Sequence, residues 1–249
     1  MTAIPDKMKE LRLAAMSQHY PQVLAETTSQ NLSFPKALER LLDLELESRH
    51  QHAIQRRFRF SRLHAQTGID QFNFQHHKSR TQNKTKILRL LDLEFIAQGA
   101  SVVLVGNPGT GKTFLAKIIG WQACQAKHRV LFTTAMDMLN QLIASQADHS
   151  LARKLKFYID PDLLLCDELG FLALDQPTSN LFFQVISGRH SRSRSTLITT
   201  NVPFSEWGNV LYNTTIATAI VDRLVENAHI LVLEGESLRK LKKSQKSPS

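Results

Sequence analysis

One run of eight residues, Gly106–Thr113, constrains the fold of this chain more than any other feature. It reads Gly-Asn-Pro-Gly-Thr-Gly-Lys-Thr and matches the pattern G-x-x-x-x-G-K-[ST]. An apolar segment, Ser101–Val105, precedes it, and a segment with helical character, Lys112–Lys127, follows it. Glycines let a backbone wrap around phosphate groups, and a helix N-terminus presents positive potential to an anion. The run therefore predicts a phosphate-binding loop between a strand and a helix.

We expect every residue of this loop to contact a nucleotide. The expected nucleotide contacts are Gly106, Asn107, Pro108, Gly109, Thr110, Gly111, Lys112 and Thr113. The Lys112 ammonium is placed to reach the β and γ phosphates, and the Thr113 hydroxyl is placed to bind Mg²⁺.

A second motif, Leu163–Glu168, is an apolar strand that ends in two acids. Alone it also fits a solvated strand end, but after a phosphate-binding loop it indicates hydrolysis of a nucleoside triphosphate. Asp167 would hold Mg²⁺, and Glu168 would act as the general base that activates the attacking water.

Two further motifs are weaker when taken alone. Asn201 follows the apolar strand Thr196–Thr200, so its amide could bind the γ phosphate or the attacking water. A turn-forming Asn before Pro203 is the alternative. Arg223 lies on a helix, where it could stabilise charge on a neighbouring subunit's γ phosphate or simply form a surface ion pair.

From Gly99 onward, short apolar segments alternate with helical ones. We expect strands over Ser101–Val105, Val130–Thr133, Leu163–Asp167, Thr196–Thr200 and Ile230–Leu233. We expect helices over Lys112–Lys127, Ala135–Ala147, Leu151–Tyr158, Thr178–Arg189 and Ile216–Glu226. This alternation predicts an α/β fold with a parallel five-stranded sheet that helices cover on both faces.

The N-terminal part carries helical periodicity instead. We expect a helix that starts near Pro5, a polar stretch over Glu26–Asn31, and a second helix from Phe34 to about residue 60. The prediction is therefore a small helical domain over residues 1–70 and an ATPase domain over residues 71–249.

The charge balance favours a polyanionic partner, since 31 Lys and Arg stand against 22 Asp and Glu, a formal net charge of +9. No acid occurs between Glu47 and Asp70, where phenylalanines lie among arginines. This cluster is either a solvated helix end or a surface that contacts phosphates. Candidate DNA contacts are Arg56, Arg57, Arg59, Arg153, Lys154, Lys156, Arg189, Arg192 and Arg194. The last two could instead lie at a subunit interface.

Other classes of protein are excluded by composition. Two cysteines, Cys124 and Cys166, are too few for a disulfide scaffold, and no apolar run reaches the ~18–20 residues of a membrane span. The N-terminus turns polar before a signal-peptide core could form. We therefore expect a cytoplasmic protein with no membrane partner.

The succession of these motifs resembles the AAA+ ATPases of the initiator and helicase-loader branch and, within it, the IstB-type transposition helper ATPases of bacterial insertion sequences. The segment Leu32–Leu38 and the tail Gly235–Arg239 are similar to that family as well. The resemblance implies ATP with Mg²⁺, Asn201 as the sensor-1 residue, and Arg223 as an arginine finger that acts across subunits of a homo-oligomer. It also implies that Arg239 binds the nucleotide, although Leu238 stands where the family pattern has an aromatic residue.

Family members bind duplex DNA, and we expect mostly phosphate contacts here. They help a partner transposase to capture its target. A replicative helicase loader of the DnaC/DnaI type is the alternative, since the ATPase motifs do not separate the two. A small-molecule kinase would need an arginine-rich lid, and no segment has that spacing.

Overall fold

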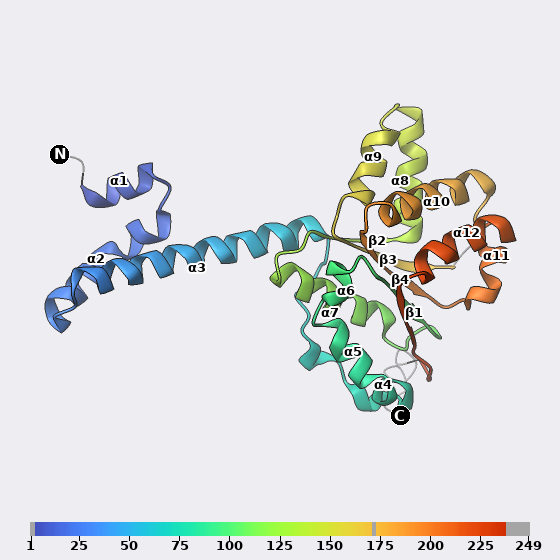
Figure 1. The fold of residues 1–249 in the computed structure, drawn as a ribbon, viewed down its shortest axis with the longest axis horizontal. Helices are drawn as coiled ribbons and strands as arrows, with labels where there is room; N and C mark the ends of the chain where they lie inside the picture. The colour runs from blue at the N-terminus through green and yellow to red at the C-terminus, as the bar shows by residue number, and fades with distance from the viewer. Residues whose placement is uncertain (1–2, 171–172, 238–249) are drawn as a thin grey trace, which may run out of the picture. The chain divides into compact units, whose positions relative to one another are not determined.

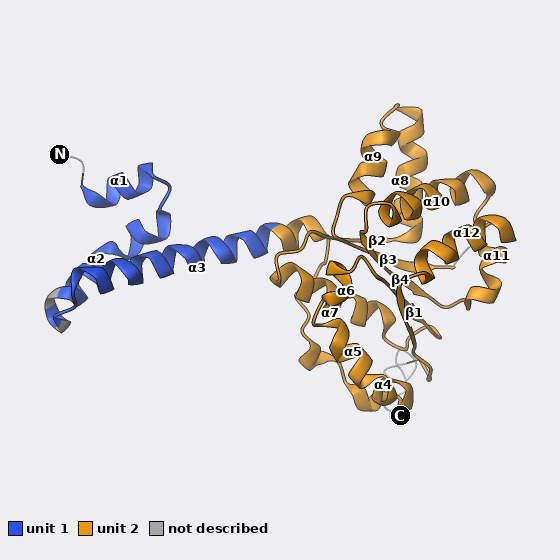
Figure 2. Ribbon diagram, viewed as in Figure 1, with its two compact units in different colours: residues 1–56 blue, residues 57–249 orange. Residues whose placement is uncertain are grey.

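The computed structural model describes residues 3–170 and 173–237 and divides into two compact units, residues 1–56 and 57–249 (Figure 2). The division falls earlier than the expected boundary at residue 70. Residues after Arg56 belong to the second unit because Phe58 packs edge-on against Trp121 and Leu63 is buried in its core.

The first unit contains α1 (Ile4–Glu10), α2 (Ala14–Gln30) and the first part of α3 (Phe34–Ser61). The helix expected from Pro5 is interrupted, since Arg12 has a φ of 58° between α1 and α2. Helix α2 includes most of the polar stretch Glu26–Asn31, since it continues to Gln30 and ends at Asn31 in the left-handed conformation. A small core holds α2 against α3 and includes Met16, Val23, Ala37 and Leu41.

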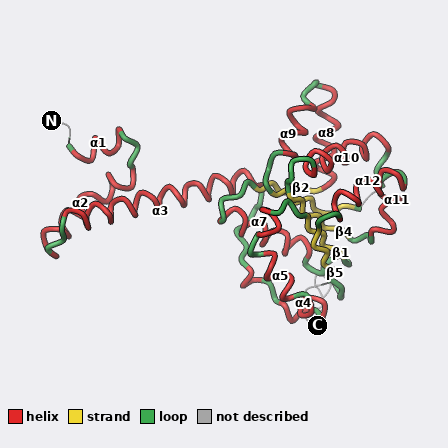
Figure 3. Tube along the Cα trace, in the orientation of Figure 1, coloured by secondary structure: helices red, strands yellow, loops and turns green. Residues whose placement is uncertain are grey.

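The second unit contains a parallel five-stranded sheet (Figures 1 and 3). Its strands are β1 (Ser101–Val105), β2 (Val130–Thr134), β3 (Leu163–Leu169), β4 (Ser195–Thr200) and β5 (Ala228–Val232). Their order across the sheet is β2-β3-β4-β1-β5. The expected fold class is confirmed, and each expected strand is present within a few residues of its predicted bounds.

Helices cover both faces of this sheet, as the alternation along β3 demonstrates. Leu163 and Leu165 belong to one hydrophobic cluster, which α7 (Lys112–Gln125) covers, whereas Leu164 and Cys166 belong to the other. The second cluster is formed mainly with helices α8 (Ala135–Ala147), α10 (Gln176–His190), α11 (Trp207–Val210) and α12 (Thr214–Val225). Helix α9 (Leu151–Ile159) packs against α8 and α10. A strand buried on both faces reads as a continuous apolar run, which is why the sequence revealed these strands.

The segment before β1 is more broken than the sequence indicated. It forms the short helices η1 (Ile69–Gln71), η2 (Phe74–His76), α4 (Lys78–Gln82), α5 (Lys84–Leu90) and α6 (Glu94–Ala97), while η3 (Phe204–Glu206) follows β4. Across the described residues, no helix combines the length and apolarity needed to cross a membrane.

Candidate active site

The phosphate-binding loop leaves the carboxyl end of β1, in the middle of the sheet. The Gly106 N–H donates to the Thr200 carbonyl at 3.1 Å, and the Leu233 N–H donates to the Val105 carbonyl at 2.8 Å. Gly106 has a φ of 152°, and a Cβ there would lie 2.0 Å from the Leu233 carbonyl oxygen. Only glycine fits this position, so the strand on one side of β1 and the chain that continues from β5 together fix where the loop begins.

Lys112 is the first residue of α7 and lies across its own loop. Its Nζ atom donates to the carbonyls of Gly106 at 2.7 Å and Asn107 at 2.9 Å. The side chain of Thr110 also donates to the Asn107 carbonyl, at 2.9 Å. The ammonium group is therefore held beside the loop backbone, at the N-terminus of α7, where a phosphate anion is favoured.

Asp167 of the second motif is hydrogen-bonded to Thr113, the last residue of the loop, and to Thr199 of β4. Thr113 Oγ1 donates to Asp167 Oδ1 at 2.9 Å, and Thr199 Oγ1 donates to the same oxygen. The Asp167 side chain is buried, so these hydroxyl groups hold its carboxyl group in place. Hydroxyl and carboxylate oxygens are the ligands that Mg²⁺ prefers, so Thr113 and Asp167 fit this ion.

Glu168 is turned out of the sheet. The register between β3 and β4 shifts between Cys166 and Leu169, and Glu168 adopts a left-handed φ of 62°. Its N–H donates to Thr199 Oγ1 at 3.0 Å, while its side chain is exposed. A bulge of this kind re-aims a side chain, and here it turns the residue that follows Asp167 toward solvent.

Asn201 lies between the two motifs. It directly follows Thr200, which pairs with Val105 of β1 on one side and with Leu169 of β3 on the other. The order of the strands therefore brings Asn201 to the same edge as the loop and the acids.

The structure does not bring Arg223 to this site. Arg223 lies in the last turn of α12, where its Nη1 donates to the Ala219 carbonyl at 2.6 Å and its guanidinium lies 4.8 Å from the Phe183 ring centre. The following strand begins with Ala228, which pairs with Ser101 at the start of β1. Arg223 is thus near the amino edge of the sheet, away from its own loop. Arg239 lies outside the described residues.

Two residues of the site gave no signal in the sequence. Thr199 is an ordinary β-branched strand residue until its hydroxyl is found on Asp167. Arg80 belonged to a polar, basic stretch, yet it is buried against the loop and donates to the Thr110 carbonyl through two nitrogens. Only contacts between distant segments reveal either role.

The prediction that Arg189 contacts DNA is wrong. Its side chain is fully buried and donates to five acceptors: the carbonyls of Tyr158, Ile159, Pro161 and Ser195, and Thr196 Oγ1. Burial lowers the pKa of Arg189 to about 9. This arginine joins the end of α9 to the beginning of β4 and is not available to a polyanion.

The other basic candidates reach the surface to different extents. Arg192 and Arg194 form ion pairs with Asp160 and Asp162, which offset their charge. Arg57 donates through Nε to the Lys127 carbonyl at 2.5 Å. The exposed candidates are Arg56, Arg59, Arg153 and Lys156, and Lys154 is half-buried.

Two basic segments far apart in the sequence meet around a pair of aromatic rings. Phe60 and Phe157 pack edge to face with their centres 5.9 Å apart. The Arg62 guanidinium lies 5.0 Å from the Phe157 centre, Lys154 Nζ lies 5.7 Å from the same ring, and the Arg129 guanidinium lies 5.5 Å from the Phe60 centre. We call these five residues the basic–aromatic surface.

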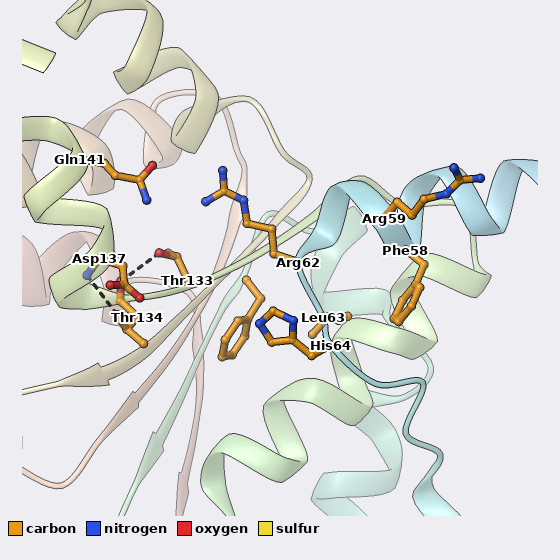
Figure 4. A pocket seen from close by; sticks show the side chains of 10 residues that line it. Phe58, Arg59, Arg62, Leu63, His64, Thr133, Thr134, Asp137 and Gln141 are labelled. Atoms are coloured by element: carbon orange, nitrogen blue, oxygen red, sulfur yellow. Dashed lines mark hydrogen bonds between the residues drawn. The ribbon is translucent and has the colours of Figure 1, made fainter.

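Two shallow pockets flank this surface and share Gln141 of α8. One, of about 480 Å³, is lined by Arg59, Arg62 and His64 among others, and the second, of about 390 Å³, by Arg153 and Lys154. Figure 4 shows the Arg62 side chain extending from the end of α3 toward the side of the first pocket that Gln141 lines.

The chain is similar to a known family of ATP-binding proteins. The model of the family described as IstB-like ATP binding protein matches residues 6–246. The chain is 34% identical over 229 residues to the ATP-binding protein of insertion sequence IS5376 from Geobacillus stearothermophilus, covering 92% of this chain and 90% of that protein. It is 31% identical over 241 residues to the ATP-binding protein of insertion sequence IS21 from Pseudomonas aeruginosa, covering 96% and 89%.

Solved structures share the fold at lower identity. The DnaC helicase loader has a TM-score of 0.59 at 22% identity, over 67% of this chain and 96% of that one. The replication initiator DnaA bound to AMPPCP and single-stranded DNA has a TM-score of 0.60 at 18% identity, over 74% and 56%. These likenesses place the second unit in the AAA+ fold.

Proposed function

The chain belongs to the family of IstB-like ATP binding proteins and is an AAA+ ATPase, and from that premise we propose that it is the ATP-dependent helper of an insertion-sequence transposase. In this proposal it assembles on duplex DNA as a homo-oligomer, hydrolyses ATP, and helps a partner transposase to capture its target.

The observation that carries the hydrolytic part is the joining of Thr113, Asp167 and Thr199 in one hydrogen-bond network beside Lys112. Lys112 and the loop amides bind the β and γ phosphates, which accounts for ATP binding. Thr113 and Asp167 would hold Mg²⁺, which offsets the charge that develops on the phosphates.

Glu168 accepts the proton of the attacking water, because its side chain is exposed and it directly follows Asp167. Asn201 orients that water or the γ phosphate from the neighbouring strand end. Arg239, at the tail, binds the nucleotide by the family resemblance.

Arg223 supplies its charge to the nucleotide of an adjacent subunit. Its position in the last turn of α12, toward the amino edge of the sheet, supports this role because an arginine so placed does not serve its own loop. ATP hydrolysis on this proposal requires an oligomer, since each site is incomplete without the arginine of a second copy.

The basic–aromatic surface supports duplex DNA as the polyanion. It brings Arg62, which directly follows α3, together with Lys154 of α9 around the Phe157 ring, although the two residues are far apart in the sequence. Exposed arginines and lysines bind phosphates without reading bases, so binding should be salt-sensitive and only weakly sequence-specific. Arg59, Arg153 and Lys156 of the second unit flank the same segments and would extend the contact.

The helicase-loader alternative rests on fold likeness alone, at 22% identity to DnaC. The relatives at 31–34% identity are named for insertion sequences, which favours the transposition helper.

A capture experiment tests this choice. The protein is loaded on immobilised duplex DNA with ATP and offered the transposase from the same insertion sequence or, separately, a replicative helicase from the same cell. We expect retention of the transposase that disappears when ATP is replaced by ADP. Retention of the helicase alone would overturn the helper proposal.

A further inference from the structure

Arg80 is a buried arginine that lies against the back of the phosphate-binding loop. It is the one buried residue of α4 and only 3% exposed. Its guanidinium donates to the Thr110 carbonyl from Nε at 3.1 Å and from Nη2 at 2.6 Å, and to the Asn73 carbonyl from Nη1 at 2.8 Å. It also stacks 4.3 Å from the centre of the Phe72 ring. These three hydrogen bonds and one ring contact, to two segments of the chain, fix the guanidinium in one place.

The guanidinium contacts the loop at the Thr110–Gly111 peptide, which directly precedes Lys112. A Cβ built on Gly111 would lie 2.1 Å from Arg80 Nη2, so only a glycine leaves room for the arginine. Because a trans peptide points its carbonyl and its N–H in opposite directions, holding the Thr110 carbonyl toward Arg80 directs the Gly111 N–H away from it. That N–H belongs to the set of loop amides that bind phosphate.

The charge of Arg80 lacks a counter-ion in the part of the chain that is described. Across residues 3–170 and 173–237, none of the ion pairs involves Arg80. Burial lowers the pKa of its guanidinium. A buried cation that binds only carbonyls is less stable than one paired with an anion, so it favours an anion arriving nearby.

From this geometry we propose that Arg80 is a positioning residue of the nucleotide site, which orients the Thr110–Gly111 peptide and whose buried charge the phosphates of a bound nucleotide offset. This role is separate from that of Lys112, which approaches the loop from α7. It predicts that removing Arg80 weakens binding in proportion to the number of phosphates, because both effects act on phosphate and neither acts on the base.

Arg80→Met tests the proposal, with Arg89→Met as the matched control. Arg89 is an exposed arginine of the adjacent helix α5, so its loss removes equal charge without touching the loop. Dissociation constants for ATP, ADP and AMP are measured with the full-length protein, together with the rise in melting temperature at saturating ATP. Circular dichroism establishes that each variant is folded.

We expect Arg80→Met to raise the dissociation constant for ATP at least tenfold, that for ADP less, and that for AMP least, and to shrink the ATP-induced rise in melting temperature. Arg89→Met should leave all of these values unchanged. Arg80→Lys keeps the charge but loses the paired donors, so it should weaken ATP binding by an intermediate amount and remain folded where the methionine variant does not.

A folded Arg80→Met or Arg80→Lys protein that binds ATP as the unmodified protein does would overturn the proposal, even with a lower melting temperature. An equal loss for ATP, ADP and AMP would also overturn it, because it would indicate general damage to the loop. The ATP site itself is tested separately, by whether Lys112→Ala loses ATP binding.

Discussion

The parallel sheet has a buried arginine at each end of its strands, and the two arginines differ in the backbone that they bind. At the carboxyl end, Arg80 donates to the Thr110 carbonyl of the phosphate-binding loop and to the Asn73 carbonyl. At the amino end, Arg189 donates to carbonyls at the end of α9 and at the beginning of β4. The first guanidinium therefore lies against a loop that binds an anion, whereas the second connects two elements of the fold.

This difference separates an arginine that supports a binding site from an arginine that only connects elements of the fold. Burial alone does not separate the two arginines, since both side chains are buried and each donates to backbone oxygens. What separates them is whether the surrounding backbone is itself an anion-binding element. We therefore expect residues at the carboxyl ends of the strands to affect nucleotide binding and hydrolysis, and residues at the amino ends to affect the stability of the fold. Arg223 is the exception, because it is proposed to act on the nucleotide of another subunit.

The largest expected effect tests that exception. Arg223→Ala should lower the DNA-stimulated ATPase rate by about 10³-fold or more, because an arginine finger offsets transition-state charge, while ATP binding by the single subunit is kept. Steady-state ATPase rates and equilibrium ATP binding check this pair of results. A normal DNA-stimulated ATPase rate in Arg223→Ala would contradict the role of Arg223 in ATP hydrolysis.

Mixing provides the control for action across subunits. Arg223→Ala keeps an intact site, and Glu168→Gln keeps an intact arginine. The mixed protein should regain activity that neither variant has alone, and a failure to do so contradicts the assignment of Arg223.

Glu168→Gln should lower the ATPase rate by about 10²–10⁴-fold, the range that general-base catalysis contributes. Nucleotide binding should persist, since Lys112 and the loop are untouched, and the ATP-bound oligomer should accumulate. Single-turnover hydrolysis and particle size measure the two effects. Hydrolysis at the normal rate would remove Glu168 from the mechanism of the carboxyl edge.

Arg189→Met should destabilise the protein by about 3 kcal/mol or more, since several buried carbonyls lose their donor at about 1–3 kcal/mol each. The effect should appear in the free energy of unfolding measured by urea titration, with little change in the ATP dissociation constant of the folded protein. A large loss of ATP affinity with unchanged stability would reverse the contrast between the two arginines.

The smallest effect concerns the basic–aromatic surface. Arg62→Ala combined with Lys154→Ala should weaken binding to duplex DNA about tenfold at low salt and reduce the salt dependence of binding by about two phosphate contacts. Fluorescence anisotropy over a salt series checks both. Arg192→Ala is the matched control, because that arginine is already paired with Asp160 and should change binding little.

How far the sequence predicted the molecule depended on the range of the interactions involved. The loop and the buried strands are local patterns, so their positions were correct to within a few residues. The interruption between α1 and α2 was missed, because a positive φ at Arg12 leaves no mark on the spacing of apolar residues.

The same reason separates the two arginines. Arg189 stands in a basic run that reads as an exposed turn, and only the carbonyls of α9 and β4 show that it is internal. Arg80 and Thr199 gain their roles from segments far away in the chain. The sequence does not reveal the role of a residue when that role depends on contacts with residues far away in the chain.

The most direct test of the central claim is to measure ATPase rate and particle mass together, with and without duplex DNA, at low salt. We expect ATP and DNA together to produce a large oligomer whose ATPase rate per subunit exceeds that of the free protein. A protein that remains monomeric on DNA with ATP would contradict it, and the helicase-loader role, which needs its helicase for assembly, would take its place.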